Sequence, residues 1–174
     1  DPVTGHVLER SHADSGQLWP LMQAQPELAA HVGERKCLGS DAPPKAPGLA
    51  GAQGVNIEGL AVKDGRLYLG FRGPVVNGVA LVMALNADAF FKGGDAQPTV
   101  TRLALGERRG IRDMVAVSDG VLLLAGPDDG SVSKGIDWQI FWWDGQSAKA
   151  LVRPKPLTLL DVSDVFLQLL VLPT

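Results

Sequence analysis

Four charged residues near the middle of the chain have the types and spacing that a small-molecule site needs. Glu58 and Arg112 hold matching positions in two similar segments, 54 residues apart, and Arg72 and Asp113 belong to the same two segments. A carboxylate and a guanidinium that converge in a desolvated recess could bind a phosphate or carboxylate, with arginine supplying a bidentate fork. The same side chains could instead form ion pairs between neighbouring elements, because buried charges need partners. We favour this structural interpretation.

Aspartates in a glycine-rich stretch form a second candidate cluster. Asp128 and Asp129 lie in the run Gly126-Pro-Asp-Asp-Gly130, and Asp137 follows in the same predicted loop. Carboxylate-rich loops can bind Ca²⁺ through oxygen ligands. Adjacent aspartates in such a run are more often turn residues, and the spacing differs from that of an EF-hand. We therefore expect no metal or other cofactor, with calcium at Asp128 and Asp129 as the alternative.

Other features of the sequence narrow the class of function. The sequence contains neither a Gly-x-Ser-x-Gly nucleophile elbow nor a P-loop. Its net charge is −3 and it has no large basic block, which disfavours nucleic acid as a partner. The longest largely apolar run, residues 165–172, is too short to cross a membrane. Cys37 is the single cysteine, so an intrachain disulfide is excluded.

An internal repeat indicates the elements that must position these residues. The segment from Ile57 to Leu69 recurs from Ile111 to Leu124, each with an Asp-Gly pair between two apolar stretches. Ile57 and Ile111 are 54 positions apart, and Gly65 and Gly120 are 55 apart. Short strands and tight turns that repeat at this length are typical of consecutive β-propeller blades. The first strand of each blade lines the central channel, so Glu58 and Arg112 are expected at its mouth.

The hydrophobic pattern divides the chain into four parts. A helical and loop segment, residues 1–54, includes one or two short helices within 15–32, with Ser15 as a possible cap, and a long loop over 39–54. Strands of the first blade, residues 55–106, are predicted at 55–62, 67–71, 79–85 and 100–105, with a turn of helix near 87–91. Strands of the second blade, residues 107–153, are predicted at 114–117, 121–125, 139–143 and 148–152. Residues 154–174 begin a third blade or contain a short helix.

Alternation along these strands predicts which side chains are buried between blades. The predicted buried residues are Leu60, Val62, Leu67, Leu69, Leu81, Met83, Val115, Val117, Leu122, Leu124 and Ile140. Two blades do not close a ring, because closed propellers have about four to eight. We therefore expect residues 1–174 to be one domain of a larger propeller, completed by missing blades of the same protein or by self-association, and not a lone monomer.

Several motifs resemble a known family. Asn56-Ile-Glu-Gly-Leu-Ala61, Gly70-Phe-Arg-Gly-Pro-Val75, Gly110-Ile-Arg-Asp113 and Leu124-Ala-Gly-Pro127 resemble DUF3616, a bacterial family of unknown function, over roughly residues 15–150. The resemblance implies a β-propeller longer than this chain and implies no activity. More remotely, the chain is similar to phytase-like esterase propellers, in which an acidic residue precedes Gly-Leu in an inner strand. The chain departs from the family in its shorter length.

These observations lead to one fold class and two hypotheses about function. The chain is predicted to be all-β, with two four-stranded propeller blades and a short helical N-terminal segment. The first hypothesis is a soluble propeller of unassigned activity that binds a partner or a small anionic ligand near Glu58, Arg72, Arg112 and Asp113. The alternative is a phosphatase-like, phytase-like or esterase-like hydrolase at the same place. Ion pairs that close between these side chains would favour the first hypothesis. Catalysis and compartment stay open.

Overall fold

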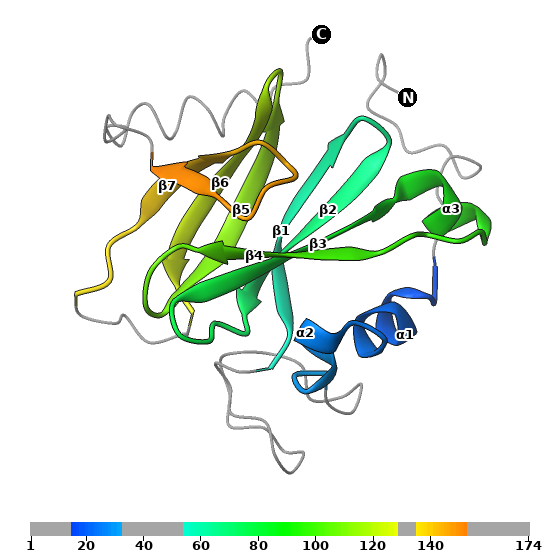
Figure 1. Ribbon diagram of the computed structural model, residues 1–174, viewed down its shortest axis with the longest axis horizontal. Helices are drawn as coiled ribbons and strands as arrows, with labels where there is room; N and C mark the ends of the chain where they lie inside the picture. The colour runs from blue at the N-terminus through cyan, green and yellow to red at the C-terminus, as the bar shows by residue number, and fades with distance from the viewer. Residues whose placement is uncertain (1–14, 33–53, 129–134, 153–174) are drawn as a thin grey trace, which may run out of the picture. The chain divides into compact units, whose positions relative to one another are not determined.

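The apolar stretches predicted to form strands fold into two antiparallel four-stranded sheets (Figure 1). The computed structural model describes residues 15–32, 54–128 and 135–152, all within one compact unit that runs from Ser15 to Arg153. Most of the predicted loop over 39–54 and the predicted further element over 154–174 lie outside the described residues.

Each sheet is a meander in which the strands follow one another in chain order. The first sheet consists of β1 (Asn56–Lys63), β2 (Arg66–Gly73), β3 (Val79–Asn86) and β4 (Thr99–Ala104). The second sheet consists of β5 (Arg109–Val117), β6 (Gly120–Pro127), β7 (Gln139–Trp143) and β8 (Ala150–Val152). The all-β class is therefore confirmed. The largest difference from the predicted bounds is at β5, which begins at Arg109 instead of Met114.

Three short helices complete the described part of the chain: α1 (Leu18–Gln23), α2 (Pro26–Ala29) and α3 (Ala87–Lys92). Ser15 is not the N-cap of α1, although its hydroxyl accepts a hydrogen bond from the backbone N–H of the capping residue, Gln17, at 3.3 Å. In α3, the Asn86 side chain accepts from Ala89 N–H at 2.8 Å, and Gly93 ends the helix at a φ of 87°. These contacts account for the predicted turn of helix.

The hairpin turns show that the two sheets correspond with a constant offset. In the first sheet Asp64 and Gly65 have φ values of 50° and 73°, the conformation that a two-residue type I′ turn requires. Lys63 pairs with Arg66 around this turn, and in the second sheet Val117 pairs with Gly120. The second turn is therefore Ser118-Asp119, and Gly120 is already in β6. The spacing of 55 between Gly65 and Gly120 is therefore not the structural offset, which is 54 from Ile57–Lys63 of β1 to Ile111–Val117 of β5.

The central strands of the first sheet, β2 and β3, are buried on both faces. Its helix-side face packs with Met22, Leu28 and Phe90 of the helices, and its sheet-side face packs against the second sheet. The helix-side face is formed by Leu67, Leu69, Phe71, Leu81, Met83 and Leu85, and the sheet-side face by Ala61, Tyr68, Ala80, Val82 and Ala84. The second sheet contributes a packed face formed by Ile111, Met114, Val121, Leu123, Ala125, Phe141 and Trp143.

Two glycines allow the sheets to approach each other closely. A Cβ atom added to Gly59 would lie 2.6 Å from Met114 Cγ, and one added to Gly70 would lie 2.6 Å from Ile111 Cγ2. Gly59 and Gly70 are paired across β1 and β2, so they form one recess on the sheet-side face. Met114 and Ile111 of the second sheet fill this recess. At the other end of the strands, the Tyr68 and Trp143 rings meet edge to face at 5.7 Å.

The burial predictions were correct for the first sheet except at β1, and wrong for the second sheet. Leu67, Leu69, Leu81 and Met83 are buried as expected. Leu60 and Val62 are instead exposed, since the described residues place nothing over them that covers these side chains. In the second sheet the side chains predicted to be buried are half-buried, because they lie on the face opposite the packed face: Val115, Val117, Leu122, Leu124 and Ile140.

Candidate functional site

Matching irregularities in β1 and β5 place the first two candidate residues. Along β1, Ile57 pairs with Phe71 and Gly59 with Gly70, so Glu58 is an extra residue without a partner in β2. Along β5, Ile111 pairs with Ala125 and Asp113 with Leu124, so Arg112 is the extra residue. A β-bulge bends the strand and re-aims the side chain of the extra residue. The two bulges, 54 residues apart, bring Glu58 and Arg112 together.

The Glu58 carboxylate joins two arginines from different sheets. Its Oε1 accepts a hydrogen bond from Arg72 Nη1 at 2.8 Å, and its Oε2 accepts from Arg112 Nε at 2.6 Å. Arg72, in β2, has a side chain that is only 5% exposed, whereas Glu58 and Arg112 are 27% and 21% exposed. Charge-assisted hydrogen bonds of this length are among the stronger contacts in proteins. We call Glu58, Arg72 and Arg112 the ion-pair cluster.

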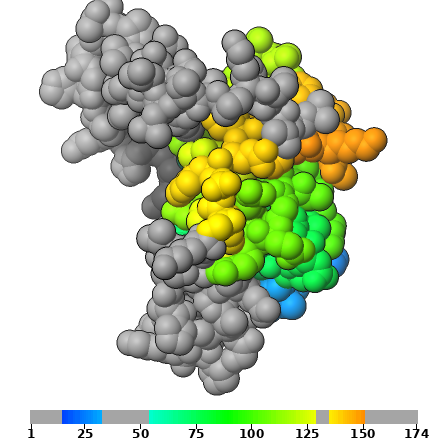
Figure 2. All heavy atoms as spheres, turned by 90° about the vertical axis from the view of Figure 1, so that its left-hand side faces the viewer, coloured from blue at the N-terminus to red at the C-terminus, as the bar shows by residue number. Residues whose placement is uncertain are grey.

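Arg112 makes two further contacts that the sequence did not indicate. Its Nη1 donates to the Pro127 carbonyl oxygen at 2.9 Å, and its guanidinium carbon lies 4.9 Å from the centre of the Trp138 ring. The Trp138 side chain is 55% exposed and lies in the segment just before β7, which is yellow in Figure 2 and forms part of the surface. The stacking of Trp138 on Arg112 depends on the path of the chain before β7, which the sequence pattern does not show.

Glycine also shapes the surroundings of the ion-pair cluster. The α-carbon of Gly110 lies so close to the Arg72 backbone that an added Cβ atom would collide with the Arg72 carbonyl group. This absence of a side chain lets β5 cross β2 at the point where Arg72 must reach Glu58. Close packing between β5 and β2 is therefore enough to explain the glycine in the Gly110-Ile-Arg-Asp113 motif.

Asp113, the fourth predicted residue, has a different environment. Its Oδ1 accepts a hydrogen bond from the backbone N–H of Met114 at 2.7 Å. Partial burial raises the pKa of the Asp113 carboxyl above its usual value of 3.8, and the Met114 hydrogen bond offsets part of that change. The structure thus brings Glu58, Arg72 and Arg112 into direct contact, while Asp113 is held by its own strand.

The aspartates considered as calcium ligands do not form a cluster in the described part of the chain. Asp128 is buried, and its Oδ1 lies 3.6 Å from Arg108 Nε. Asp137 is exposed, and Asp129 lies outside the described residues. Within residues 15–32, 54–128 and 135–152, no group of three or more His, Cys, Asp or Glu side chains is arranged to hold a metal ion. None of the helices there is long and apolar enough to span a membrane.

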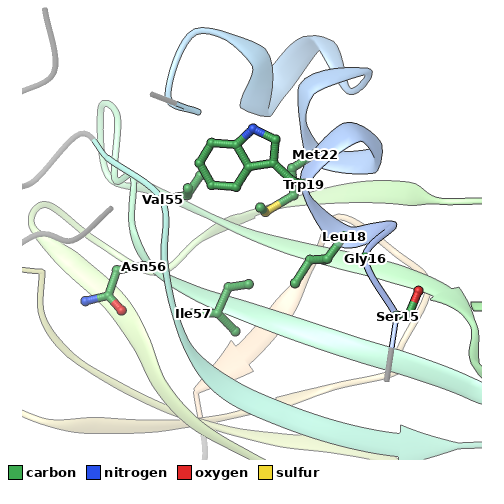
Figure 3. Close-up of a pocket in the computed structure, with 8 residues that line it drawn as sticks. All are labelled: Ser15, Gly16, Leu18, Trp19, Met22, Val55, Asn56 and Ile57. Atoms are coloured by element: carbon green, nitrogen blue, oxygen red, sulfur yellow. The ribbon is translucent and has the colours of Figure 1, made fainter. Parts of the chain in front are cut away.

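A pocket of about 460 Å³ lies between α1 and the start of β1 (Figure 3). Its described lining consists of Ser15, Gly16, Leu18, Trp19, Met22, Val55, Asn56 and Ile57. Figure 3 shows the Trp19 indole beside Val55 and Met22, with the Leu18 and Ile57 side chains near each other below it. This mainly apolar lining contains no member of the ion-pair cluster and carries no charge to attract an anion.

Comparison with known proteins identifies the family. The model of a family described as "Protein of unknown function (DUF3616)" matches residues 10–161. The chain belongs to the DUF3616 family. The predicted resemblance is therefore confirmed, and the matched region contains the three residues of the ion-pair cluster. No curated protein and no solved structure matches the chain, so the more remote similarity to phytase-like esterase propellers stays a prediction.

Proposed function

We propose that this chain forms two adjacent blades of a β-propeller that serves as a non-catalytic binding scaffold. The observation that carries the proposal is the division of the Glu58 carboxylate between Arg72 of the first sheet and Arg112 of the second. Guanidinium groups that engage both oxygens stabilise the ionised carboxylate, which makes it a weaker nucleophile and general base and leaves fewer lone pairs for a metal ion. In this proposal the ion-pair cluster fixes one blade against the next.

The same cluster offers a limited surface for a ligand. Arg72 is buried, so a ligand could meet only Glu58 and Arg112. Two guanidinium groups against one carboxylate leave the cluster with one excess positive charge. This charge favours a small anion, and the exposed Trp138 ring beside Arg112 offers a surface for its apolar part. The proposed ligand is therefore a small anionic molecule held at the edge of the cluster.

A hydrolase is the second candidate function, and Asp113 is the observation that favours it. A partly buried carboxyl group with a raised pKa is a recognised marker of catalytic sites, although structural groups show it too. The geometry supports the hydrolase less well, since Asp113 is bonded to its own strand and Glu58 is engaged by both arginines.

Substitution of Arg112 separates the two roles. In the scaffold proposal, Arg112→Ala leaves Glu58 with one partner and lowers the thermal unfolding midpoint, whereas Arg102→Ala, at an exposed position of β4, does not. The binding role is probed with inorganic phosphate, which should raise the midpoint of the wild type and not that of Arg112→Ala. Near-normal melting of Arg112→Ala, with loss only of the phosphate effect, would contradict the scaffold role and support a functional site.

A further inference from the structure

Two large apolar side chains on β1 are exposed although their neighbours are buried. Leu60 and Val62 are each 58% exposed. They pair with Leu69 and Leu67 of β2, so they belong to the helix-side face of the first sheet. Leu67 and Leu69 are buried there against the helix residues, but the described helices do not reach across to β1 at these two positions.

The equivalent positions in the second sheet show what such side chains do when a neighbour is present. The constant offset of 54 makes Met114 the counterpart of Leu60, because Met114 pairs with Leu123 as Leu60 pairs with Leu69. Met114 is only 3% exposed, since it fills the recess over Gly59 and Gly70 of the first sheet. A residue at this position therefore inserts into the glycine recess of the preceding sheet.

The two sheets consequently pack head to tail, with unlike faces in contact. Val121 and Leu123, on the packed face of the second sheet, are the counterparts of Leu67 and Leu69 on the helix-side face of the first. When unlike faces meet, a stack of such sheets has one unpaired face of each kind at its two ends. Further sheets can therefore be added until the stack closes into a ring. Helices α1 and α2 cover part of the unpaired face of the first sheet (Figure 1).

We propose that Leu60 and Val62 form the docking surface for the preceding blade of the ring, an inference that rests on the propeller proposal above. The occupant is a four-stranded sheet with small residues at the positions equivalent to Gly59 and Gly70, so that it offers a recess to Leu60. A second copy of this chain does not meet that requirement. Its own Met114 fills the first recess, and the counterparts of the two glycines in its second sheet are Asp113 and Leu124.

The experiment compares Leu60→Asp in the 174-residue chain and in the complete product of the native gene. Phe91→Asp, at another exposed apolar position (43% exposed, on α3), is the matched control. A buried aspartate without a partner is strongly destabilising, so Leu60→Asp should lower the melting midpoint of the gene product by at least about 5 °C relative to the control. In the 174-residue chain both variants should melt like the wild type.

Three results would overturn the inference. Equal melting of Leu60→Asp and the control in the gene product would show that no blade covers Leu60. Destabilisation of the 174-residue chain would show that Leu60 is needed within the chain itself. A dimer of the 174-residue chain that Leu60→Asp dissociates, measured by light scattering, would identify a second copy as the occupant. None of these results depends on Arg112, so failure here is distinguishable from failure of the scaffold proposal.

Discussion

The recess under Met114 gives a quantitative test of how the two sheets pack. Substitution of Gly70 by alanine adds one methyl group, whose carbon would lie 2.5 Å from Met114 Sδ, 2.6 Å from Ile111 Cγ2 and 3.2 Å from Ile111 Cβ. Met114 is flexible and can give way, but Ile111 is β-branched and has little rotamer freedom. The overlap must therefore be relieved by moving the second sheet or by straining Ile111.

The expected cost follows from two opposing terms. Overpacking of a well-packed core costs about 1–3 kcal/mol, and replacing a strand glycine by alanine returns about 0.5–1 kcal/mol of backbone entropy. Because two side chains are overlapped and one is stiff, we expect Gly70→Ala to lower the free energy of unfolding by about 2 kcal/mol. Gly16→Ala is the control, because an added methyl group there has no atom within 4 Å.

A double variant makes the test specific to this contact. Met114→Ala alone should cost about 2–5 kcal/mol because it leaves a cavity. Combined with Gly70→Ala, the new methyl group occupies part of that cavity, so the double variant should be more stable than the sum of the single changes by about 1 kcal/mol or more. The measurement is urea denaturation followed by circular dichroism. A neutral Gly70→Ala, or strictly additive effects, would refute the packing of Met114 over Gly70.

Three further outcomes are expected. Leu123→Ala should lower the free energy of unfolding by about 2–5 kcal/mol in denaturant titrations, while Leu124→Ala, half-buried on the opposite face, should cost clearly less, and equal losses would contradict the assigned faces. Asp113→Asn should stabilise the protein near pH 7, since a raised folded-state pKa means that ionisation of Asp113 opposes folding. The gain in unfolding free energy should disappear as the pH falls below the usual pKa of 3.8, and a gain that is independent of pH would contradict this. Asn86→Ala should lower the unfolding free energy by about 1 kcal/mol through loss of the α3 cap, and an unchanged denaturation midpoint would contradict the cap assignment.

The sequence was informative about residues whose position depends on local pattern. Alternation and turn residues located the strands, and the repeat placed Glu58 and Arg112 at equivalent points of β1 and β5. Alternation assigns side chains to two faces but does not say what covers each face. In the second sheet both faces are apolar, so the choice between Leu123 and Leu124 depended on the position of the first sheet.

Two other features of the site depend on contacts that a pattern cannot show. The bulges at Glu58 and Arg112 arise from the pairing of each strand with its neighbour, which is a property of the folded sheet. The stacking of Trp138 on Arg112 depends on the path of the chain into β7. The Asp119-Gly120 pair is also displaced by one residue relative to Asp64-Gly65, because the turn of the second sheet is Ser118-Asp119 and Gly120 already belongs to β6.

The most direct test of the central claim is a double-mutant cycle between Glu58 and Arg112. The free energy of unfolding is measured for the wild type, Glu58→Gln, Arg112→Gln and the double variant. If the pair joins the two sheets, the coupling energy should be about 1–3 kcal/mol, as expected for a partly buried hydrogen bond between charged groups. A coupling energy of about 0.3 kcal/mol or less, at the low end of the values that exposed ion pairs give, would contradict the account.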